Sequence, residues 1–407
     1  MRVFFINMHC NAFIVRTMSS ILVGSHIPTR HKSLVMGLIK NKVEVYNYVT
    51  SGSSTLPERG GLRKIRDNKE CNLKESIFVL RKNGLDAVIS IDALPTLSQN
   101  DVFILYSHYG DMNRVELSEA STKIIDFSHF YGNKIESALT KRIKPNGYFC
   151  EVDLYKYSKL FQEYYGWFKD GFLRRPFAYE ERFRCIKNFN DRKNRVCAMG
   201  NIARMNNTTE AHRDFVRFYH VFYMQPQRKL FYDKREELKD IMDCYSTIGV
   251  DTYHLRKYSE ADLIIKREFN WWWNYFVRQR FPKYHRAFDM VETYNDYKIV
   301  VNAEDSNGIY AIGAVEAMAC GCALIGRDYG VYEDLGYRKD ESYIPYDGSI
   351  GDFRDKAEYY LRPENQGKLS VIASKGCAYT REHYSEEKVF DEYFFHLIEV
   401  TDHEKKD

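Results

Sequence analysis

The sequence predicts an α/β protein of two domains, each built from a parallel sheet with flanking helices. Three observations predict this fold class. A chain of 407 residues is too long for one ordinary core and fits two domains of roughly 180 to 200 residues each. Two separate series of short apolar runs alternate with longer helical segments. The stretch 297–326 then combines a strand, a glycine turn, an apolar helix and a buried strand.

The first series opens the chain. A helix is expected at His31–Asn41, after the first strand, which is the usual start of a doubly wound sheet. Gly24 and Gly37 do not form the GxGxxG pattern, so a dinucleotide-dependent dehydrogenase loses support. The expected strands are Val3–Met8, Val43–Val49, Ala87–Ile91, Val102–Tyr106 and Lys123–Phe127.

A second series begins after an aromatic, charged segment at 154–189, so the domain boundary is placed near Asn188–Asn194. We expect a strand at Arg195–Met199, a helix from Glu210 and a strand at Ser246–Val250. A closing helix is expected at Glu386–Val400, followed by a frayed tail. The predicted division is 1–189, 190–385 and 386–407.

Composition indicates an ordinary globular protein, with 32 Tyr, 26 Phe and 29% charged residues. The net charge of +4 is small, and no zinc finger, basic zipper or RNA-binding signature occurs, so no nucleic-acid partner is expected. The nine cysteines are scattered without CxxC spacing, which favours reduced thiols in the cytosol.

The amino-terminal apolar run is broken by Asn7, His9 and Asn11, so it is interpreted as a first strand and not as a leader. No run of eighteen or more apolar residues occurs, so no spanning helix is expected.

The stretch 297–326 carries the most information about function. Lys298–Ala303 is β-branched and apolar, Glu304–Gly308 collects turn formers, and Ile309–Ala319 favours a helix that Gly321 can end. This helix is apolar all round and therefore expected to be buried, yet it contains Glu316. A buried carboxylate is costly unless it accepts hydrogen bonds, and a pair of ligand hydroxyls would supply them.

The start of the same helix offers free backbone N–H groups and a positive dipole end to a phosphate. A phosphate at the helix start and hydroxyls one to two turns along indicate a nucleotide. The alternative is structural: Glu316 would pair with a nearby Arg or Lys.

The segment Val315–Gly321 followed by Ala323–Ile325 resembles the donor motif of GT-B glycosyltransferases, especially glycogen-synthase-like and family 4 enzymes. The resemblance implies two Rossmann-like domains facing across a cleft, with Glu316 on the ribose hydroxyls and the preceding turn on the diphosphate and sugar. The family's first glutamate falls on Gly308. Its contact to the donor sugar would then come from Glu304, Asp305 or Asn307, or be absent.

Several groups are candidates for binding the donor diphosphate. The turn provides the backbone of Gly308, Ile309 and Tyr310 at the expected helix start. The resembled enzymes carry Gly-Arg after the first strand of the second domain, but here Gly200 is followed by Asn201. The side-chain candidates are therefore Arg204, Lys266 and Arg267, each of which is otherwise a solvated surface residue.

The expected chemistry is displacement at a sugar's anomeric carbon with a nucleoside phosphate leaving. No Asp-x-Asp metal site is found, so positive protein groups and not a metal are expected to stabilise the leaving group. An inverting enzyme would need a base that removes the proton from the acceptor hydroxyl. The candidates are His108, His129 and Asp111, because they follow expected first-domain strands, where ligand-facing loops belong. The alternative is that each of these side chains only makes a structural hydrogen bond. A retaining enzyme of the resembled type needs no protein base.

Trp271, Trp272 and Trp273 lie among basic residues, a mixture that favours sugar stacking or membrane interfaces. On a helix the three would span about 200 degrees, so core packing is the competing interpretation.

The sequence thus predicts a cytoplasmic glycosyltransferase, in peripheral membrane contact at most, with a nucleotide-sugar donor, a glycan, lipid-linked or other hydroxyl acceptor, and no cofactor. Two alternatives stay open. A nucleotide-sugar epimerase of the same fold would turn over the donor without an acceptor, and a noncatalytic nucleotide- or glycan-binding protein would bind without turnover.

Overall fold

The structure is a computed structural model that describes residues 1–6, 8, 29–49, 73–82, 84–106, 122–127, 130, 132–205, 210–248 and 289–403. Several of the residues singled out above lie outside this part of the chain. They are His108, Asp111, His129, Lys266, Arg267 and Trp271–Trp273.

The first sheet joins seven described strands, all parallel, in the order β3-β2-β1-β4-β5-β6-β7. The strands are β1 (Arg2–Ile6), β2 (Glu44–Tyr48), β3 (Ile89–Ile91), β4 (Asp101–Tyr106), β5 (Thr122–Asp126), β6 (Gly147–Cys150) and β7 (Phe172–Arg174). The five expected strands are the first five of these, within two residues at either end. The chain leaves β1 first toward β2 and β3 and later toward β4, so the order reverses between β1 and β4.

Burial explains why these runs form central strands. Val3, Phe4 and Phe5 of β1 are all buried, on both faces of the sheet, as is typical of parallel sheets covered by helices. The helices of this half are α2 (Thr29–Lys40), α4 (Leu73–Lys82), α5 (Lys134–Ile143), α6 (Leu154–Tyr157), α7 (Lys159–Tyr165) and the 3₁₀ turn η2 (Gly166–Phe168).

The second sheet joins five described parallel strands in the order β10-β8-β12-β13-β14. These are β8 (Lys193–Ala198), β10 (Met242–Cys244), β12 (Tyr297–Val301), β13 (Ala323–Arg327) and β14 (Ile344–Tyr346). A separate pair consists of β9 (Asn201–Ile202) and β11 (Thr247–Ile248). The expected strand at Ser246–Val250 is thus only partly right, because β10 takes the place next to β8 and ends at Cys244.

The helices of the second half pack on this sheet. They are α8 (Glu210–Tyr219), α9 (Pro226–Asp233), α11 (Met290–Asp296), α12 (Ile312–Ala319), α13 (Val331–Asp334), α14 (Ile350–Leu361) and α15 (Gln366–His383), with the 3₁₀ turns η3 (Phe189–Asp191) and η5 (Pro363–Asn365). We call each sheet with its helices a lobe, the first lobe and the second lobe.

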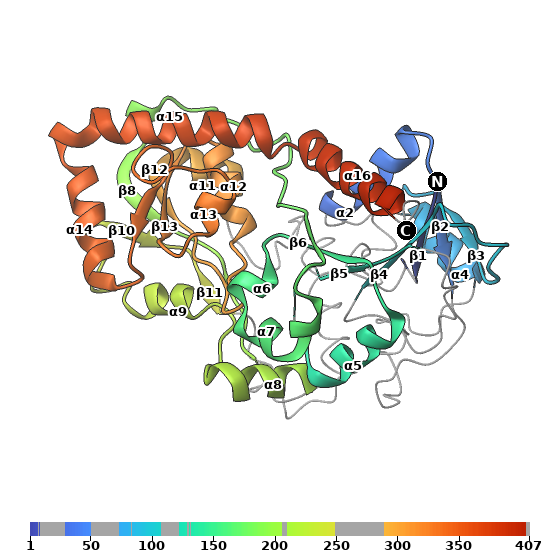
Figure 1. The fold of residues 1–407 in the computed structure, drawn as a ribbon. Coiled ribbons are helices and arrows are strands. Elements are labelled where there is room, and N and C mark those ends of the chain that lie inside the picture. Colours follow the sequence, from blue (N-terminus) through green and yellow to red (C-terminus); the bar gives the residue numbers. More distant parts are fainter. Residues whose placement is uncertain are drawn as a thin grey trace, which may run out of the picture.

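The last helix, α16 (Glu386–His403), returns to the first lobe. Figure 1 shows α15 along the second lobe and α16 continuing from its end toward α2 and both chain ends. Phe390, Tyr393 and Leu397 of α16 belong to the core of the first sheet. The rings of Tyr393 and Phe149 lie 4.6 Å apart.

The predicted α/β fold class with two parallel sheets is confirmed. The first sheet ends with β7 at Arg174 and the second begins with β8 at Lys193. The proposed domain limits at 189/190 and 385/386 stay predictions, because they concern which parts fold independently.

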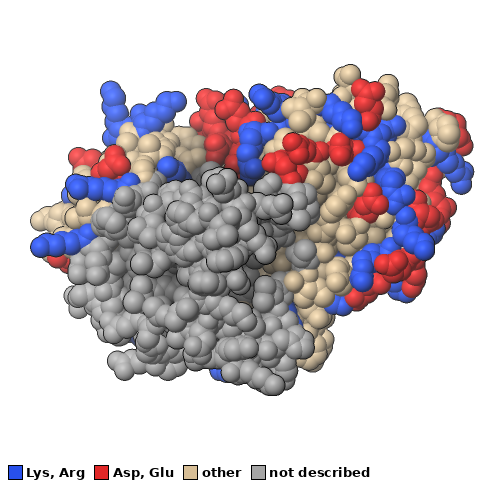
Figure 2. Space-filling model, turned by 180° about the vertical axis from the view of Figure 1, so that it is seen from behind, with Lys and Arg blue, Asp and Glu red and all other residues tan. Residues whose placement is uncertain are grey.

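Charges are mixed on the face of the second lobe seen in Figure 2, where basic and acidic side chains alternate. The described part of this face therefore carries no single-sign patch of the kind that binds nucleic acid.

Candidate functional site

The second sheet has its topological switch point between β8 and β12. β10 lies on one side of β8, and the later strand β12 lies on the other side. Ligands of open parallel sheets bind in the crevice beyond the carboxyl ends of the strands at such a point. The segment 199–205, which follows β8, and the segment 302–311, which follows β12, border this crevice.

Arg228 of α9 bridges the two segments. Its Nε donates to the Ala303 carbonyl at 3.0 Å, and its Nη1 donates to the Asn201 carbonyl at 2.9 Å. A Cβ on Gly200 would lie 3.0 Å from the Arg228 side chain, so the missing side chain leaves room for the guanidinium. Gly200 also has a φ of 134°, which disfavours other residues.

The guanidinium keeps donors for a ligand. Arginine has five N–H donors, and Arg228 uses two of them, since it makes no further hydrogen bond in the described part of the chain. Burial lowers its pKa from the usual value, and the nearby Asp305 and Glu304 carboxylates oppose that shift. Arginine stays charged at neutral pH. Three N–H donors and one positive charge are therefore present at the switch point.

The helix expected at Ile309–Ala319 begins three residues later than the sequence predicts. α12 starts at Ile312, with Ala311 as its N-cap and no side-chain cap. The Asp305 carboxylate explains the delay, because it accepts from the backbone N–H groups of Asn307 at 2.8 Å and of Ile309 at 3.0 Å. The N–H of Ile309 is therefore occupied, and the uncapped helix start lies at 311–313.

Glu316 lies in the second turn of α12. All side chains of the helix from Gly313 to Ala319 are buried, as the sequence predicts, and Glu316 itself is 8% exposed. Gly321 ends the helix as predicted, with a φ of 82° and its N–H on the Met318 carbonyl at 2.8 Å.

Two buried side-chain oxygens lie in the segment that follows β12. Asn302 Oδ1 and Glu304 Oε2 make no hydrogen bond in the part of the chain that the structure describes. Glu304 is 2% exposed, and its other oxygen pairs with Arg327 Nη1 at 3.1 Å. Burial raises the pKa of the Glu304 carboxyl. Unpaired buried oxygens are rare, and they are typical of places where a ligand or water binds.

The turn before α12 also fastens the two lobes together. Asn307 is fully buried, and its Nδ2 donates to the Phe130 carbonyl of the first lobe at 2.9 Å. Its Oδ1 accepts from Ser158 Oγ at 3.2 Å and from the Tyr219 hydroxyl at 2.9 Å. Of the three residues considered as replacements for the family glutamate, Asn307 and Asp305 are thus engaged in the turn and the lobe contact.

Gly308 is required by geometry. Its φ is 78°, and a Cβ there would lie 2.7 Å from Tyr157 Cβ and 3.2 Å from the Tyr157 carbonyl oxygen. The 2.7 Å distance is shorter than a contact between two carbon atoms allows, and the 3.2 Å distance to the oxygen is also tight. No side chain, and hence no glutamate, fits at this position while the first lobe packs against it.

A cluster of buried charges lies at the carboxyl edge of the first sheet. Asp126 ends β5, Glu151 follows β6 and Arg175 follows β7, all at the carboxyl edge of the first sheet and all at most 3% exposed. Arg175 Nη2 lies 3.0 Å from Asp126 Oδ1 and 3.5 Å from Glu151 Oε1. Glu151 is also among the charges that raise the pKa of Asp305.

Arg204 is the one predicted diphosphate cation that the structure describes. Its backbone forms an antiparallel bridge with Tyr223, and its side chain is partly buried. Arg228 was missed because its local sequence, Gln-Arg-Lys, looks like a solvated helix face. Only the tertiary fold brings α9 to the switch point. No local sequence signal could therefore have distinguished Arg228 from its neighbour Lys229 as a site residue.

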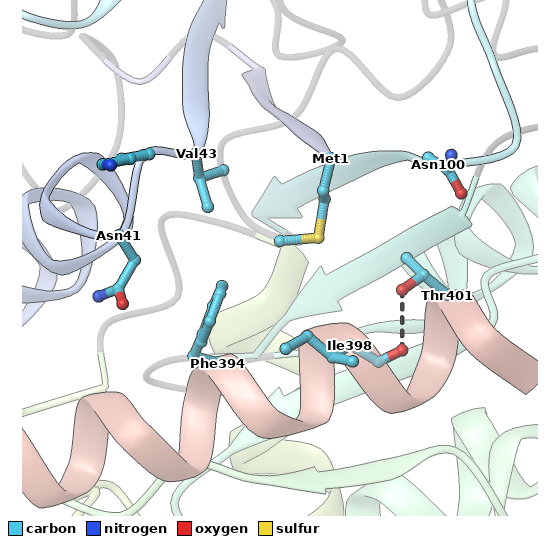
Figure 3. Close-up of a pocket in the computed structure, with 8 residues that line it drawn as sticks. Met1, Asn41, Val43, Asn100, Phe394, Ile398 and Thr401 are labelled. Atoms are coloured by element: carbon cyan, nitrogen blue, oxygen red, sulfur yellow. Dashed lines mark hydrogen bonds between the residues drawn. The ribbon is translucent and has the colours of Figure 1, made fainter.

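A groove of about 390 Å³ lies elsewhere, at the amino ends of the first-sheet strands. Figure 3 shows Met1, Val43 and Asn100 facing Phe394 and Ile398 of α16 across it. Ligands of parallel sheets bind at the opposite, carboxyl edge, so this groove is separate from the candidate site at the switch point.

Among the described residues, no group of three His, Cys, Asp or Glu side chains is arranged to hold a metal ion. No described helix is both long and apolar enough to cross a membrane.

The sequence of residues 228–394 matches the family described as glycosyl transferase-like. This region contains Arg228, the turn before α12, Glu316 and the first half of α16. A comparison with curated proteins finds no match.

Several solved structures have a similar fold. A sucrose-phosphate synthase from Thermosynechococcus elongatus has 10% identity and a TM-score of 0.53, with 98% of each chain covered. A glycosyltransferase from Rickettsia africae has 10% identity, a TM-score of 0.52 and 98% coverage of both chains. HepE from Anabaena, in complex with UDP-glucose, has 10% identity and a TM-score of 0.52, covering 98% of this chain and 100% of the other.

At such identities the likeness establishes the fold, which is the predicted GT-B fold of two Rossmann-like lobes. The family match in the second lobe and this fold together support a transferase.

We predict that Gly308→Ala destabilises the protein by roughly 1–3 kcal/mol, because it forces a side chain into a left-handed turn and against Tyr157. Denaturant unfolding would measure the change. Gly367→Ala is the matched control, since a Cβ there meets nothing within 4 Å. A Gly308→Ala variant as stable as the wild type would contradict the packing described here.

We predict that Asp305 makes stability depend on pH. Burial raises its pKa from 3.8 to about 7, so between these values the folded protein holds a proton that the unfolded chain has released. Stability should fall as the pH rises from about 4 to 7 and level off above. Asp305→Asn should flatten this slope in thermal unfolding at several pH values, whereas Asp355→Asn, at an exposed site, should not. Equal slopes in all three proteins would refute the assignment.

Proposed function

We propose that the protein is a glycosyltransferase that moves a sugar from a nucleotide-sugar donor, bound mainly by the second lobe, to a hydroxyl acceptor held mainly by the first. The observation that carries this proposal is Arg228, which joins both segments of the switch point and keeps three N–H donors there. The second of these segments leads into the uncapped start of α12.

The geometry suits a nucleoside diphosphate. The Arg228 guanidinium supplies a full positive charge, and the first turn of α12 supplies N–H groups and the positive end of the helix dipole. The guanidinium and the helix N–H groups are positioned before the reaction begins, so they would stabilise the negative charge that develops on the leaving phosphate. Glu316, one turn further along the same helix, would accept hydrogen bonds from the ribose hydroxyls, as the sequence resemblance implies.

This placement revises the sequence-based assignment in one respect. The diphosphate contact moves from Gly308 and Ile309 to the backbone at 311–313, because the Asp305 turn occupies the N–H of Ile309. Arg228 takes the part first given to Arg204, Lys266 or Arg267. We propose that this positive charge serves without a metal, and that no cofactor is needed.

The proposal for the acceptor and for the catalytic base is based on the sequence alone. His108, Asp111 and His129 remain the proposed bases for an inverting reaction, and a retaining reaction would leave the proton to the departing phosphate. We propose a glycan, a lipid-linked sugar or another hydroxyl compound as acceptor, and action in the cytoplasm.

UDP is the first nucleotide to test, because HepE, which shares the fold, was crystallised with UDP and with UDP-glucose. The experiment is calorimetric titration of UDP, GDP, ADP and CMP into the wild type, Glu316→Ala and Arg228→Lys. We predict micromolar binding of one nucleotide, weakened at least tenfold (about 1.4 kcal/mol) by either substitution. Glu364→Ala, at an exposed site, is the control and should bind as the wild type does.

Absence of binding to any nucleotide would remove the proposal. Binding that Glu316→Ala leaves unchanged would show that Glu316 is structural. Binding and donor turnover without an acceptor would favour the epimerase, and binding without any turnover would favour a noncatalytic protein.

A further inference from the structure

Three polar side chains from the two lobes meet beside the Gly308 turn. Lys156 Nζ lies 2.5 Å from Asp334 Oδ2, and the Tyr157 hydroxyl donates to the same oxygen at 2.5 Å. Lys156 and Tyr157 end α6 in the first lobe, and Asp334 ends α13 in the second. We call these three residues the cross-lobe triad.

The triad lies directly at the turn that precedes α12. The Cβ of Tyr157 occupies the space that a side chain at position 308 would need. The Tyr157 ring packs edge-on against Tyr329, with ring centres 5.9 Å apart, and the Tyr329 hydroxyl donates to the Gly308 carbonyl at 3.1 Å. Tyr157 therefore packs both against Gly308 and against Tyr329, which is itself hydrogen-bonded to the turn.

The triad has unused hydrogen-bonding capacity. Asp334 Oδ1 accepts from no described residue, and Lys156 keeps N–H donors beyond the one on Asp334. The Lys156 and Asp334 side chains are 52% and 45% exposed, so a ligand can reach them. Partial burial acts to raise the pKa of Asp334, but the hydrogen bonds that it accepts from the Lys156 ammonium and the Tyr157 hydroxyl outweigh this effect, so its pKa is lowered. An ionised carboxylate, an ammonium and a phenol hydroxyl can together accept and donate to neighbouring sugar hydroxyls.

We propose that the cross-lobe triad forms the wall against which the transferred sugar of the donor lies, with Tyr157 in the place that a side chain at position 308 would otherwise fill. This inference rests on the proposed function and assigns its sugar contact to the first lobe. Because the Lys156 charge is already balanced by Asp334, the triad has no positive charge left for a sugar carboxylate. The donor sugar is therefore an uncharged one that carries free hydroxyls, and not a uronic acid.

The test compares binding of a nucleotide with and without its sugar. The probes are the pairs UDP and UDP-glucose, GDP and GDP-mannose, and ADP and ADP-glucose, with UDP-glucuronic acid as the charged sugar. Each is titrated into the wild type, and the pair that binds is then titrated into Tyr157→Phe, Asp334→Asn and Tyr155→Phe. Tyr155 lies on the same helix with 37% of its surface exposed, so Tyr155→Phe is the matched control.

We expect Tyr157→Phe and Asp334→Asn to weaken binding of the nucleotide sugar at least fivefold while the free nucleotide binds as before, and Tyr155→Phe to change neither. The wild type should bind UDP-glucuronic acid at least tenfold more weakly than the uncharged conjugate it prefers. An equal loss for nucleotide and nucleotide sugar would overturn the inference, since it would show that the triad only docks the lobes. Unchanged affinities, or equal binding of the acidic sugar, would also overturn it while leaving the proposed function intact. Absence of any nucleotide binding would remove both.

Discussion

The Arg228 guanidinium is the interaction on which the site depends. It holds the carbonyls of Asn201 and Ala303, so the segments that follow β8 and β12 cannot separate without losing two charge-assisted hydrogen bonds. A partly buried cation needs compensation, and the carboxylates of Glu304 and Asp305 provide it. The three N–H donors that the guanidinium does not use remain at the switch point for a bound ligand.

The second constraint is the contact between the lobes. The turn from Asp305 to Ile309 is closed by its own carboxylate and then fixed to the first lobe by Asn307. Because the same turn leads into α12, a ligand bound at the helix start shares a rigid segment with the lobe interface. Under the proposed function, donor binding is coupled to the relative position of the lobes through these few hydrogen bonds.

Much of this arrangement was readable in the sequence, and the rest was not, for physical reasons. The alternation of apolar runs predicted both sheets, and the apolar stretch before Gly321 predicted α12 and its end, because periodicity and glycine turns are local properties. The later start of α12 depends on the Asp305 side chain closing a turn, which competes with helix formation and leaves no periodic signal. Arg228 and Tyr157 reach the site through tertiary contacts alone. The glycine at 308 looked like a lost glutamate, and the structure shows instead that Tyr157 occupies that space.

The central claim is that a nucleoside diphosphate binds at the switch point of the second lobe. A crystal structure of the protein with the tightest-binding nucleotide tests it most directly. The account predicts diphosphate oxygens within about 3.2 Å of the free Arg228 nitrogens and of backbone N–H groups at 311–313, with the ribose hydroxyls on Glu316. A nucleotide bound elsewhere, such as in the groove under α16, or one whose diphosphate does not contact Arg228, would contradict the account.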